Sequence, residues 1–533
     1  MYSSVLRVPT NDDEVSYVNT EDSLISSRTS TETVNSDKKE LDCYLSKRTR
    51  KLGDHIWLII GVVAMLWGTG MLIYTPYELL MDQRIHMLPG LPPFDWWLHP
   101  PDEVLLKVYI FNVTNSEEFL NGTDAKLKLK EVGPIIYREK LRHTNPIFNE
   151  NGTLTYTANR SAIYLPELNT IDMNQTIIMP NLAVLFIPSY FYDAPFYMKM
   201  GVNLMMSRSK SSPFVRTTIQ NYLWNETDPI LDVCQKLAPS LVPTKNVGIL
   251  DRIYSNFEDN VTVYIGPTFG HDRFFLIDKY DGSEWLPKRE GRCSDKVVNS
   301  SEGVSYPQFL TKNDTLKYWR KTLCKVGELD YERDVEKYGV TAYKYTLLPT
   351  TYDRTLPEED DCYKGEPTLP NGLADVSVCY FDTAIAASFP HYLYGDDVVQ
   401  NYVEGLNPDV KKHESYVIVE PNTGIPLHGI ARSQINLVMK NMRGFNQKMQ
   451  KFSDMSIPLV WLEYNQVGIP WYIEWLIYFT VVLVPILQTL FTIFLFVTST
   501  SFICYYAFIR IQSRDNLLEN KKLHFESEIF LKT

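Results

Sequence analysis

Few side chains in this sequence have the types and spacing that catalysis or metal binding requires. The nine histidines form no His-Glu-x-x-His pair, and the chain has no Gly-x-Ser-x-Gly elbow and no phosphate-binding loop. The acid pairs Asp360–Asp361 and Asp396–Asp397 are neighbours in sequence, which is more typical of solvated loops than of acid–base catalysis. His391 lies in the aromatic run Phe389–Tyr394 and is expected to be a packed structural residue. We therefore expect no enzyme, no metal site and no cofactor.

Nine asparagines stand in the Asn-x-Ser/Thr motif, which accepts N-linked glycans on exposed segments in the secretory pathway. One such motif can arise by chance, but nine in one region of the chain indicate a glycosylated domain. From Asp314 to Glu474 there is none, which indicates either a covered surface or chance spacing. The nine are Asn112, Asn121, Asn151, Asn159, Asn174, Asn225, Asn260, Asn299 and Asn313.

The chain has seven cysteines, and five of them fall in the same region as the glycan motifs. Cys43 and Cys504 lie outside it and could carry palmitate or remain inert thiols. In an oxidising compartment an odd number leaves at least one thiol free or paired between chains. Any four of the five allow three pairings, and their spacing does not choose among them. The five are Cys234, Cys293, Cys324, Cys362 and Cys379.

The elements that hold this region in place are two uncharged hydrophobic segments, one near each end of the chain. The first covers residues 56–75, and the second lies within residues 475–509. A transmembrane helix needs about 20 apolar residues, so both qualify. The segment Pro76–Glu474 then lies on one side of a membrane and both tails lie on the other.

The charges that flank the two segments predict the orientation, because excess Lys and Arg mark the cytoplasmic side. Residues 47–51 before the first segment and Arg510 and Arg514 after the second are basic, while the opposite flanks are acidic or mixed. Both tails, residues 1–51 and 510–533, are therefore expected in the cytoplasm, with the first tail disordered. The first segment is too long for a cleaved signal peptide and is expected to be a signal anchor.

The region between the spans is predicted to be mostly β, because many short runs alternate apolar and polar residues and end in Gly, Pro or Asn. Two stretches, Asn181–Tyr222 and Leu316–Leu323, have helical spacing instead. The net charge of −12 and the absence of a basic patch exclude a nucleic-acid partner. The predicted strands are Val104–Asn112, Leu154–Leu165, Val261–Ile265, Phe274–Lys279, Ala342–Leu348 and Ser415–Glu420.

Four stretches together closely resemble the class B scavenger receptor family, which includes the lysosomal integral membrane protein and the insect sensory neuron membrane proteins. The resemblance covers about residues 50 to 510, and the order and spacing of the motifs carry it. The first stretch holds Phe111–Asn115, Glu118–Leu120, Glu131–Pro134 and Tyr137–Glu139. The second holds Arg208–Ser212, Leu223–Trp224 and Asp228–Pro229. The third holds Phe389–Tyr394, Gly405–Pro408, His413, Tyr416, Glu420–Pro421, Thr423–Gly424, Arg432, Gln434 and Asn436, and the fourth is Pro458–Glu463.

The resemblance implies an irregular antiparallel β-barrel with an apical helical bundle and an internal hydrophobic tunnel, anchored by two transmembrane helices. It also implies a non-enzymatic receptor that binds lipids, lipoproteins or protein ligands at its apex and passes lipid to the membrane or takes up its ligand. Arg208 and Lys210 match basic apical positions, and Met198, Met205 and Met206 would add an adaptable apolar surface. The alternative for these residues is a plain solvated turn.

The resemblance further implies two disulfides, Cys293–Cys362 and Cys324–Cys379, and leaves Cys234 as a free thiol. A third family bridge has lost both partners here, at about Lys364 and Thr368. The first span also lacks a clean Gly-x-x-x-Gly, since its nearest small pair is Ala64 and Gly68, and this puts a homo-oligomer through the spans in doubt.

Two questions stay open at this stage. An ectodomain-gated ion channel has the same two-span topology, although Gln488 and scattered hydroxyls are the only polar groups that the spans offer to a pore. The location is expected to be the plasma membrane, with an endosomal or lysosomal sorting receptor as the alternative. Leu517–Leu518 resembles a dileucine signal, but Ser513 stands where such a signal has an acid.

Overall fold

The computed structural model describes residues 55–101, 103–237, 239, 242, 244–255, 258–286, 295–380 and 382–530. The chain divides into two compact units. The helical unit comprises Met1–Thr75 with Gln488–Thr533, and the sheet unit comprises Pro76–Leu487. The predicted N-terminal tail, residues 1–51, lies outside the described residues.

Both predicted spans are helices that are long and apolar enough to cross a membrane. The first helix covers His55–Ile73. The second runs over Trp471–Glu526 and consists of α11 (Trp471–Tyr478), the π-helical turn η8 (Phe479–Leu483) and α12 (Val484–Phe530). The two apolar helices agree with a two-span membrane protein.

Small residues of the first helix face the second helix within the helical unit. The Ser499 hydroxyl donates a hydrogen bond to the Gly61 carbonyl oxygen at 2.7 Å. A Cβ atom added to Gly61 would lie 3.0 Å from Cγ1 of Ile503, and one added to Gly68 would lie 3.4 Å from the Phe496 ring. Small residues such as Gly61 and Gly68 allow two helices to pack closely. In this chain both glycines pack against the second helix of the same chain.

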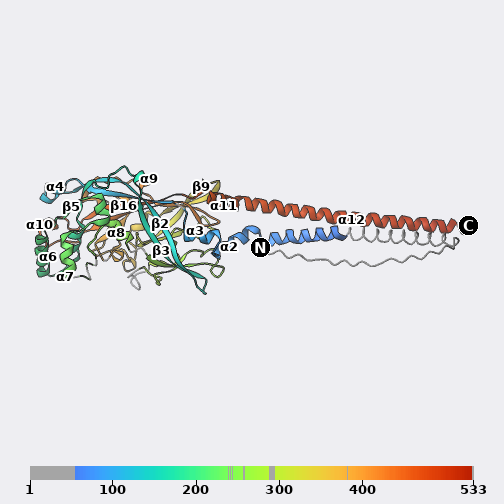
Figure 1. The fold of residues 1–533 in the computed structure, drawn as a ribbon, viewed down its shortest axis with the longest axis horizontal. Helices are drawn as coiled ribbons and strands as arrows, with labels where there is room; N and C mark the ends of the chain where they lie inside the picture. Colours follow the sequence, from blue (N-terminus) through green and yellow to red (C-terminus); the bar gives the residue numbers. More distant parts are fainter. Residues whose placement is uncertain are drawn as a thin grey trace, which may run out of the picture. The chain divides into compact units, whose positions relative to one another are not determined.

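The sheet unit is built around one large, mostly antiparallel sheet (Figure 1). Its main strands follow the order β7-β6-β3-β2-β1-β16-β15-β14-β10-β9-β8. The strands are β1 (Glu103–Val113), β2 (Leu127–Phe148), β3 (Thr153–Tyr164), β6 (Glu258–Tyr264), β7 (Ile277–Tyr280), β8 (Leu316–Arg320), β9 (Lys325–Lys337), β10 (Val340–Leu347), β14 (Tyr416–Glu420), β15 (Ile425–Val438) and β16 (Ser456–Gly468), with the short β11 (Ala374–Asp375), β12 (Ile385–Ser388) and β13 (Val403–Glu404) beside them.

The local sequence explains the central strands. In β1, Leu106, Val108 and Ile110 alternate along one face and are fully buried, as the period of two requires. Strand β16 has a continuous buried stretch from Ser456 to Tyr464 instead, because both of its faces are covered. In register, Val108 of β1 lies opposite Leu462 of β16 and Ile135 of β2.

A single three-residue segment, Asn299–Ser301, connects the two edge strands of the sheet. On one side, the Ile277 amide of β7 donates to Ser300 O at 2.8 Å and the Asn299 amide donates to Ile277 O at 2.9 Å. On the other side, the Ser301 amide donates to Lys317 O, and the Trp319 amide of β8 donates to Ser301 O, both at 2.8 Å. The polar backbone edges of β7 and β8 are thus both paired with this segment.

Helices gather at both ends of the sheet unit (Figure 1). One end carries α6 (Phe196–Ser209), α7 (Pro229–Leu237) and α10 (Gln447–Gln450), and the other carries α2 (Pro76–Ile85), α3 (Pro92–Leu98) and α11. The remaining α-helices are α4 (Ser116–Asn121), α5 (Leu182–Tyr190), α8 (Ile249–Tyr254) and α9 (Val410–His413).

The helical prediction for Asn181–Tyr222 is confirmed at both ends and wrong for the strand between them. Helices α5 (Leu182–Tyr190) and α6 (Phe196–Ser209) and the helical residues 219–222 agree with it, but Phe214–Thr218 is the strand β5, which pairs with β4 (Thr176–Pro180). Pro213 interrupts the helical register, and the β-branched residues that follow it favour a strand.

The predicted helix at Leu316–Leu323 is wrong, because Leu316–Arg320 forms strand β8. Leu316, Trp319 and Leu323 have helical spacing, but pairing with β9 decides the conformation, with Tyr318 opposite Gly327. The other strand predictions agree with the structure to within a few residues, except that Phe274–Lys279 begins late. Strand β7 starts at Ile277, since Phe275 has a φ of +64°.

Cys324 and Cys379 are joined by a disulfide, as the resemblance implies. Cys362 is also disulfide-bonded, while Cys293 lies outside the described residues, so that its pairing stays a prediction. Cys234 is buried and unbonded, and Cys504 is exposed and unbonded. All nine predicted glycan acceptors are exposed except Asn112 and Asn159, which are half-buried, and their glycosylation stays a prediction.

Candidate binding cavities

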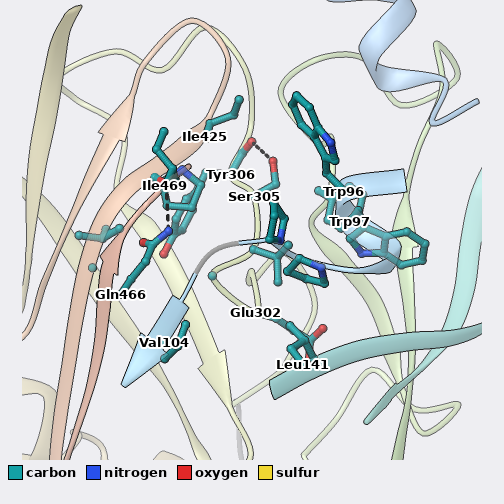
Figure 2. Close-up of a pocket in the computed structure, with 18 of the residues that line it drawn as sticks. Trp96, Trp97, Val104, Leu141, Glu302, Ser305, Tyr306, Ile425, Gln466 and Ile469 are labelled. Carbon is teal, nitrogen blue, oxygen red and sulfur yellow. Dashed lines mark hydrogen bonds between the residues drawn. The ribbon is translucent and has the colours of Figure 1, made fainter. Parts of the chain in front are cut away.

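The first candidate site is a cavity of about 940 Å³ beside α11, here called the α11 cavity (Figure 2). Its lining comes from the segment after the first span, Leu80–Val104, and from the segment that begins the second, Ile469–Thr480. Strands β2, β3, β8, β14, β15 and β16 contribute further lining residues. Figure 2 shows Trp96, Trp97, Val104, Leu141, Glu302, Ser305, Tyr306, Ile425, Gln466 and Ile469 among the lining residues.

Local packing holds the α3 and α11 walls of this cavity together. Pro92 and Pro93 begin α3, where fixed φ angles suit the first helical turn. The ring centroids of Trp96 and of Tyr472 in α11 are 5.7 Å apart, and Ile473 and Ile477 of α11 belong to a buried hydrophobic cluster that includes residues of β10 and β14. Two segments far apart in sequence therefore form one apolar wall.

A buried histidine supports the Trp97 side of the wall. His143 of β2 stacks on Trp97 with ring centroids 4.6 Å apart and donates through Nδ1 to the Trp97 carbonyl oxygen. Burial lowers the pKa of His143 to about 3, although the Trp97 hydrogen bond partly opposes this effect. Burial likewise lowers the pKa of His413 to about 4.

We expect the folded protein to lose stability in acid through these histidines. A depressed folded-state pKa means that the unfolded chain binds the proton more readily, so stability falls as pH drops below 6.5 and continues to fall towards the folded value. At pH 5 the His143 contribution to this loss is roughly 2 kcal/mol. Thermal unfolding of the wild type and of His143→Phe at pH 7 and pH 5 measures it. The variant should show a clearly smaller drop between the two pH values, and an equal drop would contradict the role of His143.

Four charged side chains form one wall of the α11 cavity: Glu139, Arg160, Glu302 and Arg320, here called the charged wall. Each side chain is less than 10% exposed. Arg320 Nη2 lies 2.6 Å from Glu139 Oε1, and Arg160 lies 3.6 Å from Glu139 and 3.9 Å from Glu302. A compact ion cluster thus borders an otherwise largely apolar space.

Tyrosines complete the charged wall. The Tyr156 hydroxyl donates to Glu302 Oε2 at 2.7 Å, the Tyr254 hydroxyl donates to Glu139 Oε1 at 2.9 Å, and the Tyr464 ring lies 3.6 Å from the Arg320 guanidinium carbon. Burial alone would raise the pKa of Glu139, but Arg320 and Arg160 more than offset it and hold that pKa below its usual value. Burial raises the pKa of Glu302 above its usual value despite Arg160 and the Tyr156 hydrogen bond.

The second candidate site is a cavity of about 1130 Å³ between α5, α6 and α7, here called the α6 cavity. Its lining includes Phe186, Val202, Leu231 and Cys234. The Cys234 thiol lies 3.8 Å from the Met205 sulfur, and burial raises its pKa, which makes it a poor nucleophile.

The two cavities share no lining residue, and helix α8 borders the α6 cavity and contacts one lining residue of the α11 cavity. Arg252 of α8 lines the α6 cavity, and Tyr254 of the same helix binds Glu139 of the charged wall. The charged wall therefore stands between the α11 cavity and the helix that borders the α6 cavity.

The structure separates the five predicted ligand residues. Arg208 and Lys210 are exposed at the end of α6, where Lys210 takes the left-handed conformation with a φ of +56°. Met198 and Met205 line the α6 cavity. Met206 is only 3% exposed and belongs to the core, so it offers no surface to a ligand.

The charged wall was not predicted from the sequence. The sequence of β3 could have indicated this wall. Leu154, Tyr156 and Ala158 point inward at every second position, and Arg160 continues the same face. A charge in the inward register of a strand marks either a buried ion pair or a site. Its partners Glu302 and Arg320 lie far along the chain, and no local pattern connects them.

His391 is a packed structural residue, as predicted. It is 5% exposed, stacks on His413 at 4.5 Å and lies 2.8 Å from Glu131. Its Nδ1 accepts a hydrogen bond from the Asn407 amide, which fixes the ring. Within the described ranges, no three His, Cys, Asp or Glu side chains are grouped so that they could hold a metal ion.

Comparison with known proteins agrees with this architecture. A model of the CD36 family matches residues 58–510. The chain is 28% identical to rat scavenger receptor class B member 1 over 76% of its own length and 79% of that protein. It is also 28% identical to rat lysosome membrane protein 2, over 72% of this chain and 80% of the relative, and 26% identical to the human form of that protein. Since the family match covers the whole sheet unit and most of both hydrophobic helices, this chain belongs to the CD36 family.

Proposed function

We propose that this protein is a class B scavenger receptor-like membrane glycoprotein that binds lipids, lipoproteins or other anionic ligands and passes lipid to the membrane. The α11 cavity carries this proposal, because its wall is built from the segments that directly adjoin both spans in the sequence. In this proposal, lipid leaves the cavity beside these segments.

The physical advantage of an internal path is simple. A lipid chain exposed to water costs about 0.8 kcal/mol per CH₂ group, so an apolar conduit lowers the barrier to transfer without covalent chemistry. In this proposal the α6 and α11 cavities are the two halves of one tunnel, and the sheet, with its edges paired through Asn299–Ser301, is a closed barrel around it.

Ligand capture is assigned to the exposed end of α6. Arg208 and Lys210 supply positive charge there, and Met198 and Met205 supply soft apolar contacts at the rim of the α6 cavity. Phe196 and Tyr197 add exposed aromatic surface to the same helix, at 72% and 67% exposure. Charge and apolar surface together suit a lipid particle with anionic head groups.

The proposed topology places the sheet unit outside the cytoplasm and both tails inside. The nine glycan motifs all belong to the sheet unit, and all nine side chains are at least partly accessible. The plasma membrane is the favoured location, and the similarity to lysosome membrane protein 2 keeps an endosomal or lysosomal site as the alternative. The cited relatives are named as receptors or lysosomal membrane proteins, which favours a receptor over an ion channel.

The test of the proposed path is to fill the α11 cavity at Gly429. A Cβ atom there would lie 3.6 Å from Val417 Cγ2, in ordinary contact, so a side chain can enter without a backbone clash. In Gly429→Phe we expect the rate of fluorescent lipid transfer from donor particles to fall about tenfold or more, since displacing two CH₂ groups already costs ~1.6 kcal/mol. Gly429→Ala leaves the cavity open and is the matched control.

Capture should respond to different residues. Arg208→Glu with Lys210→Glu should lower particle binding at low salt while leaving the cavity unchanged, and high salt should reduce the difference, because the Debye length is about 8 Å at physiological salt. Normal transfer in Gly429→Phe would remove the α11 cavity from the path. Unchanged binding in the charge-reversed protein would show that Arg208 and Lys210 take no part in capture and that the end of α6 is a solvated turn.

A further inference from the structure

The turn between β9 and β10 has an unusual residue at its tip. Strand β9 ends at Lys337 and strand β10 begins at Val340, so Tyr338 and Gly339 form a two-residue turn. Both residues have positive φ angles, +54° and +76°. Such turns favour Asn-Gly or Gly-Gly, because a bulky side chain at positive φ is strained. A tyrosine at this position indicates that its side chain makes contacts that offset the strain.

The tip makes these contacts with the beginning of the second apolar helix. The Tyr338 hydroxyl is hydrogen-bonded to the backbone of Ile469, two residues before α11. A Cβ atom added to Gly339 would lie 3.2 Å from Cδ2 of Tyr478. The tip is thus fixed beside α11 and η8. The partly buried side chains of the surrounding hydrophobic cluster include Val335, Val481 and Val482.

The level of this contact along the helix agrees with the outer surface of a bilayer. The proposed topology places Arg510, which ends the uncharged segment, at the inner surface. A bilayer with its head groups is about 40–45 Å thick, which an untilted helix crosses in about 27–30 residues. Counted back from Arg510, this distance ends at about residues 480–483, and a tilt of about 20° extends it to about residue 478. The tip beside Tyr478 then lies at the level of the outer head groups.

The outward face of α11 has the side chains that favour this layer. Trp471 and Trp475 are 77% and 58% exposed, although Ile473 and Ile477 of the same helix are buried. The Trp475 ring stacks on the Phe479 ring with centroids 5.4 Å apart. Trp and Tyr are enriched where a membrane meets water, because their rings are apolar and carry one polar group.

Lys337 adds a positive charge to the tip. Its Nζ lies 5.2 Å from the centre of the Tyr338 ring, and the side chain is half-buried. Glu474 of α11 is an opposite charge that acts on it. The stem of a lysine can lie along an apolar surface while its ammonium group reaches a phosphate. An aromatic ring with an adjacent cation matches a phospholipid, whose phosphate lies above its acyl chains.

We propose that the hairpin tip and the outward face of α11 form one docking surface for phospholipid head groups, on the side of the membrane where the sheet unit lies. The surface consists of Lys337, Tyr338, Trp471 and Trp475, and it holds the sheet unit to the bilayer at a point besides the two spans. Since α11 continues directly into the second span, this face reaches the head-group layer without a protein partner. None of the four residues lines either cavity, so the inference is independent of the lipid path.

The test measures how water reaches the hairpin in the full-length chain in phosphatidylcholine nanodiscs. A spin label is attached at Glu336→Cys, next to the tip, with Cys43 and Cys504 replaced by serine. The matched control is a label at Asp330→Cys, exposed on the same strand and roughly 20 Å from the first position. The label at residue 336 should be about fivefold less accessible to a water-soluble nickel chelate than the control, while dissolved oxygen, which enters membranes, still reaches it.

A second variant removes the docking side chains and keeps the turn. Tyr338→Asn creates Asn-Gly, the favoured sequence for this turn, so the hairpin should still form. Combined with Trp471→Ser and Trp475→Ser, it should raise nickel accessibility at residue 336 to within about twofold of the control position, because the apolar surface that enters the interface is lost. Leu356→Ser removes an apolar side chain that is 87% exposed and lies outside the docking surface, and it should change nothing.

Three results would overturn the inference. The first is equal nickel accessibility at residues 336 and 330 in the otherwise unchanged protein. The second is a label at residue 336 that is shielded from oxygen as well as nickel, which would indicate a protein cover such as a second copy of the chain. The third is unchanged shielding in the triple variant. The lipid path is tested separately by Gly429→Phe and stands or falls on its own result.

Discussion

Replacing Cys324 or Cys379 with serine should destabilise the sheet unit by about 2–5 kcal/mol and retain the protein in the secretory pathway. The bridge joins residues 55 positions apart, and Cys324 is fully buried in the core. Its loss frees a long loop in the unfolded chain and places a serine hydroxyl in or against the hydrophobic cluster that contains Cys324. The measurement is the fraction of chain with mature glycans, together with thermal unfolding of the purified protein.

The free thiol provides the control for this prediction. Cys234 is buried and unbonded, and its thiol makes a weak contact with the Met205 sulfur. The Cys234→Ser variant should therefore mature normally and lose much less stability than the Cys324→Ser variant. Equal retention of the Cys234 and Cys324 variants would show that cysteine loss acts through general misfolding. Normal maturation of Cys324→Ser would contradict a structural role for the bridge.

Arg320→Met should destabilise the protein by roughly 3–5 kcal/mol, because it leaves the buried Glu139 carboxylate without its short ion pair. Arg160, at 3.6 Å from Glu139, is too distant for a short hydrogen bond and should recover only part of the loss. Chemical unfolding of the full-length protein in detergent would measure the difference.

A second substitution tests the cause. Glu139→Leu in the Arg320→Met background removes the unpaired charge, so the double variant should be more stable than Arg320→Met alone. If the stability loss of the double variant, relative to the wild type, equals the sum of the losses of Arg320→Met and Glu139→Leu, the two side chains have no interaction energy and the prediction is wrong. Lys317→Met, on the exposed face of β8, is a control that should change stability by less than about 0.5 kcal/mol.

The sequence predicts those parts of the fold whose hydrophobic pattern lies within one continuous segment. The two spans are single uninterrupted apolar runs, and β1 shows its alternation within eleven residues. Leu182–Tyr190 and Phe196–Ser209 are likewise helical, as their own spacing predicts. Each of these signals depends on neighbours a few positions away, which is the range that periodicity covers.

The secondary-structure predictions fail where pairing with a segment distant in sequence determines the conformation. Leu316–Arg320 became a strand because β9 offers it a hydrogen-bonded partner, and Phe214–Thr218 became one because β4 does. The charged wall joins Glu139 to Arg320 across 181 positions, so no window of sequence contains both charges. Of the predicted capture residues, Met206 faces the core. The helical period shows which residues share a face of α6, but it does not show which of those faces the rest of the protein covers.

The segment Asn299–Ser301 has a mechanical consequence for the sheet. Unpaired edges of β7 and β8 would present open backbone groups to other chains, as edge strands do in proteins that aggregate. Here three residues carry the joint, through four backbone hydrogen bonds, whereas strands β1 and β2 are paired along most of their length. This three-residue connection is therefore held by fewer backbone hydrogen bonds than the pairing of β1 with β2. Asn299 is exposed and stands in a glycan motif within this connection, so a sugar attached to it would cover the backbone groups that join the edges of β7 and β8.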